Sequence, residues 1–176
     1  MKRITTTIAI VAAGLALGAH DAAAQVRLSV AGGPSFPVSH LADEMNTGFN
    51  VLVGAGLSVP VLPVGLRVDG MLNQFPEAGH DGNFRVISGS VNAILDIPMV
   101  VARPYIIGGL GVYNSRFTDD HDHGDEGSTT NLGANIGAGV RVGLPGISVF
   151  AETRLHNIFS EGEQARFIPL SVGIRL

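Results

Sequence analysis

The sequence predicts an all-β protein, an eight-stranded antiparallel up-and-down transmembrane β-barrel preceded by a cleavable signal peptide. Three observations support this prediction. Apolar residues occupy every second position in short segments, the N-terminus resembles an export signal, and the links between segments alternate between tight turns and long polar loops. Alternation with a period of two gives a strand two faces in different environments, as in a barrel whose outer face meets lipid.

The N-terminal segment 1–24 has the organisation of a Sec-type signal peptide. Lys2 and Arg3 precede an apolar run at 8–17, and small residues complete the segment. The run is shorter than the roughly 20 residues that a membrane-spanning helix needs, so we expect cleavage after export. The expected mature barrel domain is 25–176, which lacks the cysteines of a disulfide framework.

The expected strands, in chain order, are 26–34, 49–59, 64–75, 84–97, 104–117, 131–144, 147–159 and 166–176. Proline-containing breakers end the second, fourth and sixth strands, at 60–63, 98–103 and 145–146. The first, third, fifth and seventh strands are followed by longer polar links, at 35–48, 76–83, 118–130 and 160–165. This layout is typical of outer-membrane barrels and places both termini in the periplasm.

The alternation also predicts which side chains face lipid, because a slip of one residue would turn a whole strand inside out. In the fifth strand, Ile106, Leu110 and Val112 compete with Tyr105, Ile107 and Tyr113, and the facing stays open. Elsewhere the expected lipid face is Val26, Leu28, Val30, Val51, Val53, Ala55, Leu57, Val59, Val64, Leu66, Val68, Leu72, Ile87, Val91, Ala93, Leu95, Ile97, Leu132, Ile136, Ala138, Val140, Val142, Ile147, Val149, Ala151, Leu155, Ile168, Leu170, Val172, Ile174 and Leu176.

The opposite parity collects charged residues, which we expect to pair across a narrow interior. In an eight-stranded barrel the interior is only wide enough for side chains to fill it, so paired charges would block flow. The expected luminal charge network is Arg67, Asp69, Asp96, Arg141, Glu152, Arg154 and Arg175.

The formal net charge is −4, and most acidic residues lie in the four long links. An acidic outer end disfavours nucleic acid as a partner.

Three strings resemble the outer-membrane β-barrel domain family, which includes the small OmpA- and OmpX-like eight-stranded barrels. They are RPYIIGGLGVY at 103–113, FAETRLH at 150–156 and IPLSVGIR at 168–175. The resemblance implies an outer-membrane barrel that acts as an adhesin, as an envelope stabiliser or in an unassigned role. The sequence departs from the family pattern in two ways: it contains no Trp, and its last residue is Leu176 rather than an aromatic residue.

Phenylalanines offer a substitute for the aromatic girdle that such barrels carry at the membrane interface. We expect an outer girdle near the loops made of Phe36, Phe49, Phe75, Phe84, Phe117, Phe159 and Phe167.

The candidate metal ligands are Asp120, His121, Asp122 and His123 in the link after the fifth strand. Imidazole suits transition metals and carboxylate suits calcium, so the mixture identifies no ion, and a solvated loop explains the composition equally well. Catalysis is not expected, and neither is a cofactor. Glu152 and His156 share the luminal parity without a nucleophile beside them.

The leading functional hypothesis is a monomeric outer-membrane barrel with a structural or adhesive role. Its expected partners are the lipid bilayer, lipopolysaccharide and, at the loops, divalent cations or cell-surface ligands. One alternative is a narrow pore. A second is a soluble, lipocalin-like carrier, which would turn the apolar parity inward.

Overall fold

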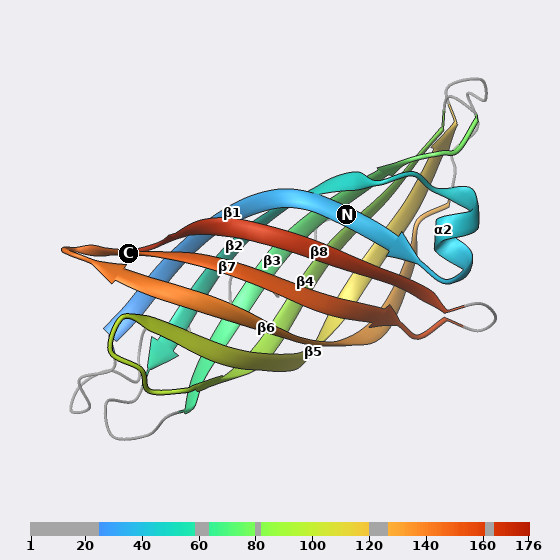
Figure 1. Ribbon diagram of the computed structural model, residues 1–176. Helices are drawn as coiled ribbons and strands as arrows, with labels where there is room; N and C mark the ends of the chain where they lie inside the picture. The colour runs from blue at the N-terminus through green and yellow to red at the C-terminus, as the bar shows by residue number, and fades with distance from the viewer. Residues whose placement is uncertain (1–24, 59–63, 80–81, 120–126, 161–163) are drawn as a thin grey trace.

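The computed structural model describes residues 25–58, 64–79, 82–119, 127–160 and 164–176 (Figure 1). The expected signal peptide, 1–24, lies outside these residues. The elements in chain order are β1 (Gln25–Val38), α2 (His40–Glu44), β2 (Gly48–Ser58), β3 (Val64–Pro76), β4 (Gly82–Asp96), β5 (Ala102–Asp119), β6 (Thr129–Leu144), β7 (Ile147–Ile158) and β8 (Ala165–Arg175).

The eight strands form one closed antiparallel barrel, which confirms the predicted fold class. Each strand pairs with its neighbour in the chain, and β8 returns to pair with β1. Every strand ends within four residues of its predicted boundary. Among the described residues, no helix is long and apolar enough to cross a membrane.

The barrel has two unlike ends. We call the end where β1 begins and β8 finishes the turn end, because the short links after β2, β4 and β6 also lie there. The link between β6 and β7 is Pro145-Gly146, and the φ of 81° at Gly146 suits the third position of a type II turn. The opposite end carries α2 and the links after β1, β3, β5 and β7, and we call it the loop end (Figure 1). The link after β3, 77–81, is shorter than the sequence predicted, because β3 and β4 each continue beyond their expected ends.

The seam between β1 and β8 contains an interruption in its pairing. The register passes from Gly32↔Val172 directly to Ser35↔Pro169, and proline has no N–H to donate to the ladder. The side chain of Asn50 covers this gap from inside the barrel. Its amide nitrogen lies 2.9 Å from both Gly33 O and Pro34 O and 3.3 Å from Leu170 O. Asn50 therefore joins two strands where their backbones do not.

The structure settles the facing of β5, which the sequence left open. Ile106, Leu110 and Val112 are exposed on the outer wall, whereas Tyr105 and Tyr113 are buried inside. Inside the barrel, Tyr105 OH bonds to Glu152 and Tyr113 OH bonds to His156. Aliphatic side chains at these two positions would leave Glu152 and His156 without these bonds.

The short helix α2 was not predicted. It lies within the expected loop 35–48, after β1 has continued four residues beyond its predicted end. Leu41 and Met45, four residues apart, are buried at the loop end of the barrel. That spacing is typical of one face of a helix, but a single turn is too short for sequence periodicity to reveal.

Candidate functional site

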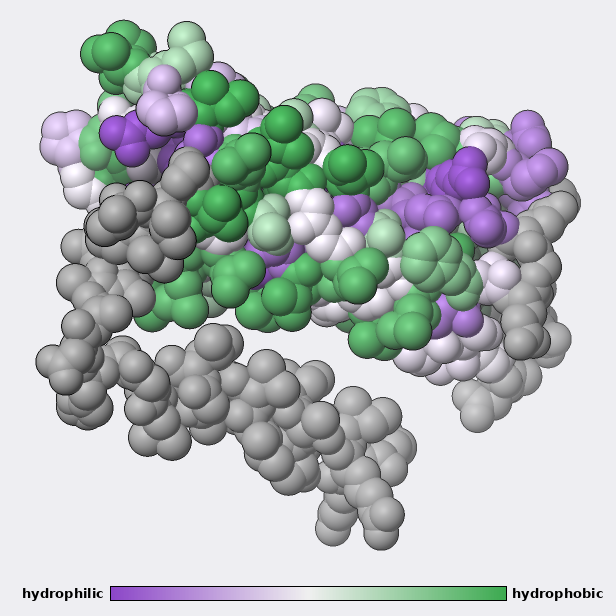
Figure 2. Space-filling model, turned by 90° about the horizontal axis from the view of Figure 1, so that it is seen from below, coloured by the Kyte–Doolittle hydropathy of each residue, from purple (hydrophilic) through white to green (hydrophobic). Residues whose placement is uncertain are grey.

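The outer wall of the barrel is apolar, and most of the described side chains that were predicted to face lipid are exposed on it, while Val59 lies outside the described residues. Val26, Leu66, Val91 and Ile136 are each more than half exposed, although they are aliphatic. Figure 2 shows hydrophobic residues over much of the middle of one face, with hydrophilic residues gathered toward the ends. An apolar surface of this extent is unusual for a protein surrounded by water and marks contact with another apolar phase.

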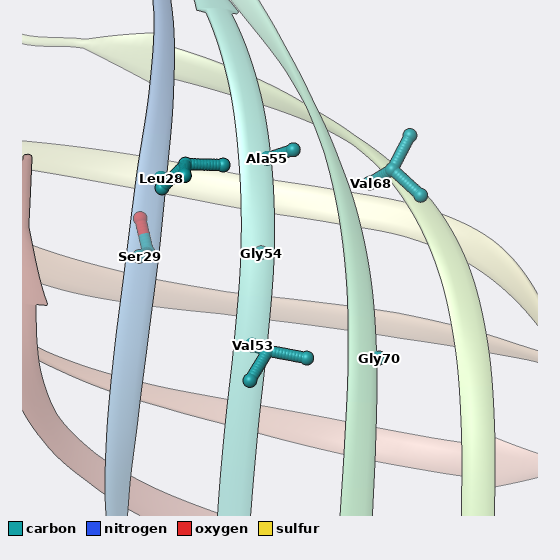
Figure 3. A pocket seen from close by; sticks show the side chains of 7 residues that line it. All are labelled: Leu28, Ser29, Val53, Gly54, Ala55, Val68 and Gly70. Carbon is teal, nitrogen blue, oxygen red and sulfur yellow. The ribbon is translucent and has the colours of Figure 1, made fainter. Parts of the chain in front are cut away.

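A shallow depression of about 450 Å³ interrupts this wall over β1, β2 and β3 (Figure 3). Leu28, Val53 and Val68 stand around it, and Gly70 leaves its floor without a side chain. It lies on the outer surface, open to the surroundings, and does not have the enclosed form of a lipocalin ligand cavity.

The centre of the interior holds four charged side chains in a ring of ion pairs. Arg67 Nε lies 2.8 Å from Asp69 Oδ1 and 3.0 Å from Oδ2, and Arg67 Nη2 donates to Glu152 Oε1 at 2.7 Å. Arg154 closes the ring through Nη1 to Asp69 Oδ2 at 3.0 Å and through Nε to Glu152 Oε1 at 2.9 Å. Two guanidinium groups thus neutralise two carboxylates, all of them buried.

Neutral side chains extend this ring across the barrel. Tyr105 OH donates to Glu152 Oε2 at 2.7 Å, and Asn92 Nδ2 donates to Asp69 Oδ2 at 2.9 Å. Asn135 Nδ2 in turn donates to Asn92 Oδ1 at 2.9 Å. Because these bonds link β3, β4, β5, β6 and β7, they hold opposite sides of the barrel at a fixed separation. The sequence placed Asn92 and Asn135 on the same inward side as the charges, but it left the facing of Tyr105 open.

The remaining residues of the expected luminal charge network lie apart from this ring. Arg141 Nη1 lies 3.3 Å from Asp96 Oδ1, and its guanidinium lies 5.0 Å from the centre of the Tyr105 ring. Arg175 is buried near the turn end, where β8 finishes. Four of the seven predicted residues therefore form the ring, and Arg141 and Asp96 form a further pair.

The loop end of the interior is filled by an apolar cluster that the sequence did not predict. Its buried members are Leu41, Met45, Phe75, Val86, Tyr113, Ile158 and Phe167. The prediction that Phe75 and Phe167 belong to an outer girdle was wrong, because both are completely buried. They have the inward parity of their strands, and the ring centroids lie 5.6 Å apart. Phe36, Phe49 and Phe159 are exposed, as the girdle prediction required, while Phe84 and Phe117 pack against the cluster.

His156 belongs to this end of the interior. Its ring stacks on Phe167 with centroids 4.9 Å apart, and its Nδ1 lies 2.9 Å from Tyr113 OH. Glu152, the acid considered beside it in a catalytic pair, is instead bonded to Arg67, Arg154 and Tyr105. The two groups are thus engaged in separate contacts.

The candidate metal ligands Asp120, His121, Asp122 and His123 lie outside the described residues. Within the described part of the chain, no group of three or more His, Cys, Asp or Glu side chains is arranged to hold a metal ion. At the loop end, His40 Nδ1 lies 4.0 Å from Asp43 Oδ2, and both side chains are largely exposed.

Comparison with known proteins supports the fold. No family model matches the chain, and no curated protein is significantly similar to it in sequence. Among solved structures, Neisserial surface protein A has a TM-score of 0.70 at 19% identity, covering 86% of this chain and 96% of that one. The N-terminal β-barrel domain of Pseudomonas aeruginosa OprF has a TM-score of 0.50 at 20% identity over the same shares of the two chains.

A third similar structure is Ail, the attachment invasion locus protein of Yersinia pestis, in complex with the heparin analogue sucrose octasulfate. Its TM-score is 0.52 at 16% identity, covering 86% of this chain and 99% of that one. At these identities the likeness concerns the fold. The chain has the fold of small eight-stranded outer-membrane barrels, in agreement with the resemblance of its sequence.

Proposed function

We propose that this protein is a monomeric integral outer-membrane barrel with a closed lumen, whose acidic loops contact surface ligands outside the cell. The turn end faces the periplasm and the loop end faces outward. Neither a reaction nor a cofactor is part of the proposal. The barrel serves as a rigid support for the loops.

The observation that carries the membrane assignment is the division of polarity across the barrel wall. Aliphatic side chains such as Val53, Leu66 and Ile136 are exposed, while Arg67, Glu152 and Arg154 are buried inside. A soluble carrier needs the reverse arrangement, with its apolar parity around a ligand and its charges in water. In lipid, this closed wall leaves no sheet edge, and its backbone groups are paired between strands except at the β1–β8 interruption, where the Asn50 side chain supplies the donor.

Fractionation and gel mobility test this assignment. We expect the expressed protein to resist extraction by salt, to require detergent, and to migrate faster unheated than boiled, because the closed barrel stays compact until it is heated. As a matched control, a signal-bearing periplasmic protein should be released by osmotic shock. Recovery of this protein in the shock fluid would support the lipocalin-like alternative instead.

The closed lumen is supported by the side chains that cross it. The Arg67, Asp69, Glu152 and Arg154 ring spans the centre, and the apolar cluster around Phe75 fills the loop end. We expect the purified protein to give no steady conductance steps in planar lipid bilayers. Single-channel steps of uniform size would instead establish the narrow pore, and a known porin reconstituted in parallel would check the assay.

The contact role is proposed for the loops on the basis of their charge. The link 118–130 alone contains four aspartates and one glutamate, which favours basic surfaces and divalent cations as partners. Ail, a barrel of the same fold, forms a complex with a heparin analogue, which is a polyanion. The acidic loops of this chain favour the opposite charge.

Calorimetric titration tests cation binding at these loops. We expect weak heats with zinc or calcium from the protein in detergent, and their loss when Asp120, His121, Asp122 and His123 are all replaced by serine. A variant with Asp43→Asn and Glu44→Gln, on the exposed face of α2, is the matched control for acidity. Absence of heat with both ions would remove divalent cations from the proposed partners, and equal heats from the serine variant would place the binding elsewhere.

A further inference from the structure

Few of the outward-facing positions in the described strands hold a charged residue. The exceptions are Arg85 on β4, Arg116 on β5 and Arg166 on β8, and each lies near the loop end of its strand. No acidic residue has the outward parity in any described strand. The loop end of the wall is therefore basic, although the loops beyond it are acidic.

Arg85 and Arg116 are directly opposite one another in the ladder between β4 and β5. Side chains in opposite register have Cβ atoms about 5 Å apart, and like charges at this separation repel each other. Their outward neighbours include Gln74, Asn83 and Asn114, which are neutral. The sequence thus places two cations side by side without a carboxylate in the surrounding wall.

Neither guanidinium takes part in an ion pair with any side chain that the structure describes. Arg166 differs in this respect. It donates through Nε to Asn157 Oδ1 at 3.0 Å and through Nη2 to Gln164 Oε1 at 2.7 Å. The Arg85 and Arg116 side chains are instead exposed and available to a ligand from outside the protein.

The arginine pair lies at the upper boundary of the apolar wall. Ile87 lies on the same face of β4 as Arg85, two residues nearer the turn end, and is half exposed. On β5, Val112 lies four residues from Arg116 and is also exposed. With a rise of about 3.3 Å per residue, the two guanidinium groups stand within roughly one to two side-chain lengths of the apolar band. In a membrane this is the level of the lipid headgroups.

We propose that Arg85 and Arg116 together bind a phosphate group of an outer-leaflet lipid. This inference rests on the proposed outer-membrane location and adds a specific lipid site to it. A phosphate monoester carries close to two negative charges and accepts hydrogen bonds at three oxygens, so it can bridge two guanidinium groups and relieve their repulsion. The lipid tails of the same molecule would lie along the aliphatic side chains below.

The experiment uses the full mature barrel in dodecyl maltoside, a detergent without phosphate, and measures lipid binding by native mass spectrometry. The probes are bisphosphorylated lipid A, the same lipid after removal of both phosphates, and inorganic phosphate. The variant is Arg85→Gln with Arg116→Gln. The matched control is Arg103→Gln with Arg27→Gln, because Arg103 and Arg27 lie near the turn end and removing them changes net charge equally.

We expect the Arg85→Gln, Arg116→Gln variant to bind bisphosphorylated lipid A about tenfold more weakly than wild type, whereas the control variant retains wild-type affinity. The dephosphorylated lipid should bind all three proteins equally and weakly. Equal affinity of the wild type and the Arg85, Arg116 variant, or equal loss in the control, would overturn the site. Displacement of the lipid by millimolar inorganic phosphate would overturn the assignment to a lipid.

A separate measurement distinguishes failure of this site from failure of the proposed location. Flotation with phosphatidylcholine vesicles reports membrane insertion without reference to lipid A. Normal flotation with unchanged lipid A affinity in the variant overturns the phosphate site alone. Failure of the wild type to float after refolding would overturn the membrane location, and the lipid site with it.

Discussion

Replacing Glu152 by glutamine should destabilise the barrel strongly, because this carboxylate completes the central ring of ion pairs. It accepts from Arg67 Nη2 at 2.7 Å, from Arg154 Nε at 2.9 Å and from Tyr105 OH at 2.7 Å. Glutamine has nearly the same shape but no charge, so two buried guanidinium groups would share the single carboxylate of Asp69. Hydrogen bonds to charged groups contribute about 1.5–3 kcal/mol each, and breaking a buried ion pair costs about 3–5 kcal/mol. We expect a loss of about 3–5 kcal/mol in the free energy of unfolding.

The assay is equilibrium unfolding in urea of the barrel in detergent, followed by the heat-dependent gel shift. Glu44→Gln, on the exposed helix α2, is the control and should change stability by less than about 0.5 kcal/mol. Adding Arg154→Met to Glu152→Gln restores neutrality around Arg67 and Asp69 and should recover more than about 1 kcal/mol. A loss below about 1 kcal/mol for Glu152→Gln, or strict additivity in the double variant, would refute the reasoning.

Three further substitutions test packing and backbone features of the fold. Asn50→Ala removes the donor to the carbonyls of Gly33, Pro34 and Leu170 and should cost about 1–3 kcal/mol in urea unfolding, whereas Asn114→Ala on the exposed wall should cost little. Gly139→Leu places a side chain against the Tyr105 ring and should cost about 1–3 kcal/mol, whereas Gly143→Leu, with open space around it, should not. Gly146→Ala forces alanine to a φ of 81° and should cost about 1 kcal/mol relative to Gly143→Ala; equal stability of these two alanine variants would contradict the turn assignment.

The strands and their facing could be predicted because alternation is a local property of the sequence. Val51, Val53 and Ala55, for example, need no knowledge of a partner strand to be assigned to one face. The same rule could not decide β5, where both parities are apolar and the choice depends on partners for Tyr105 and Tyr113 across the barrel.

The girdle prediction failed for a related reason. Phe75 and Phe167 were assigned by residue type and by nearness to the loops, whereas their positions in the pleat direct them inward. The periodicity of the sequence also does not predict which side chains pair inside the barrel. Arg67 meets Glu152 across 85 residues of sequence, and only the closed geometry decides that these two charges meet while Arg141 pairs with Asp96.

The interrupted seam between β1 and β8 has a consequence for biogenesis. The other strand pairings join strands adjacent in the chain, whereas Ser29 on β1 pairs with Arg175 on β8, across the full sequence of the barrel. Contacts so distant in sequence are entropically costly and form slowly. Until they form, both outermost strands present unsatisfied peptide groups that invite misassociation. Because Pro169 brings no N–H to this junction, closure of the barrel depends in part on the side chain of Asn50.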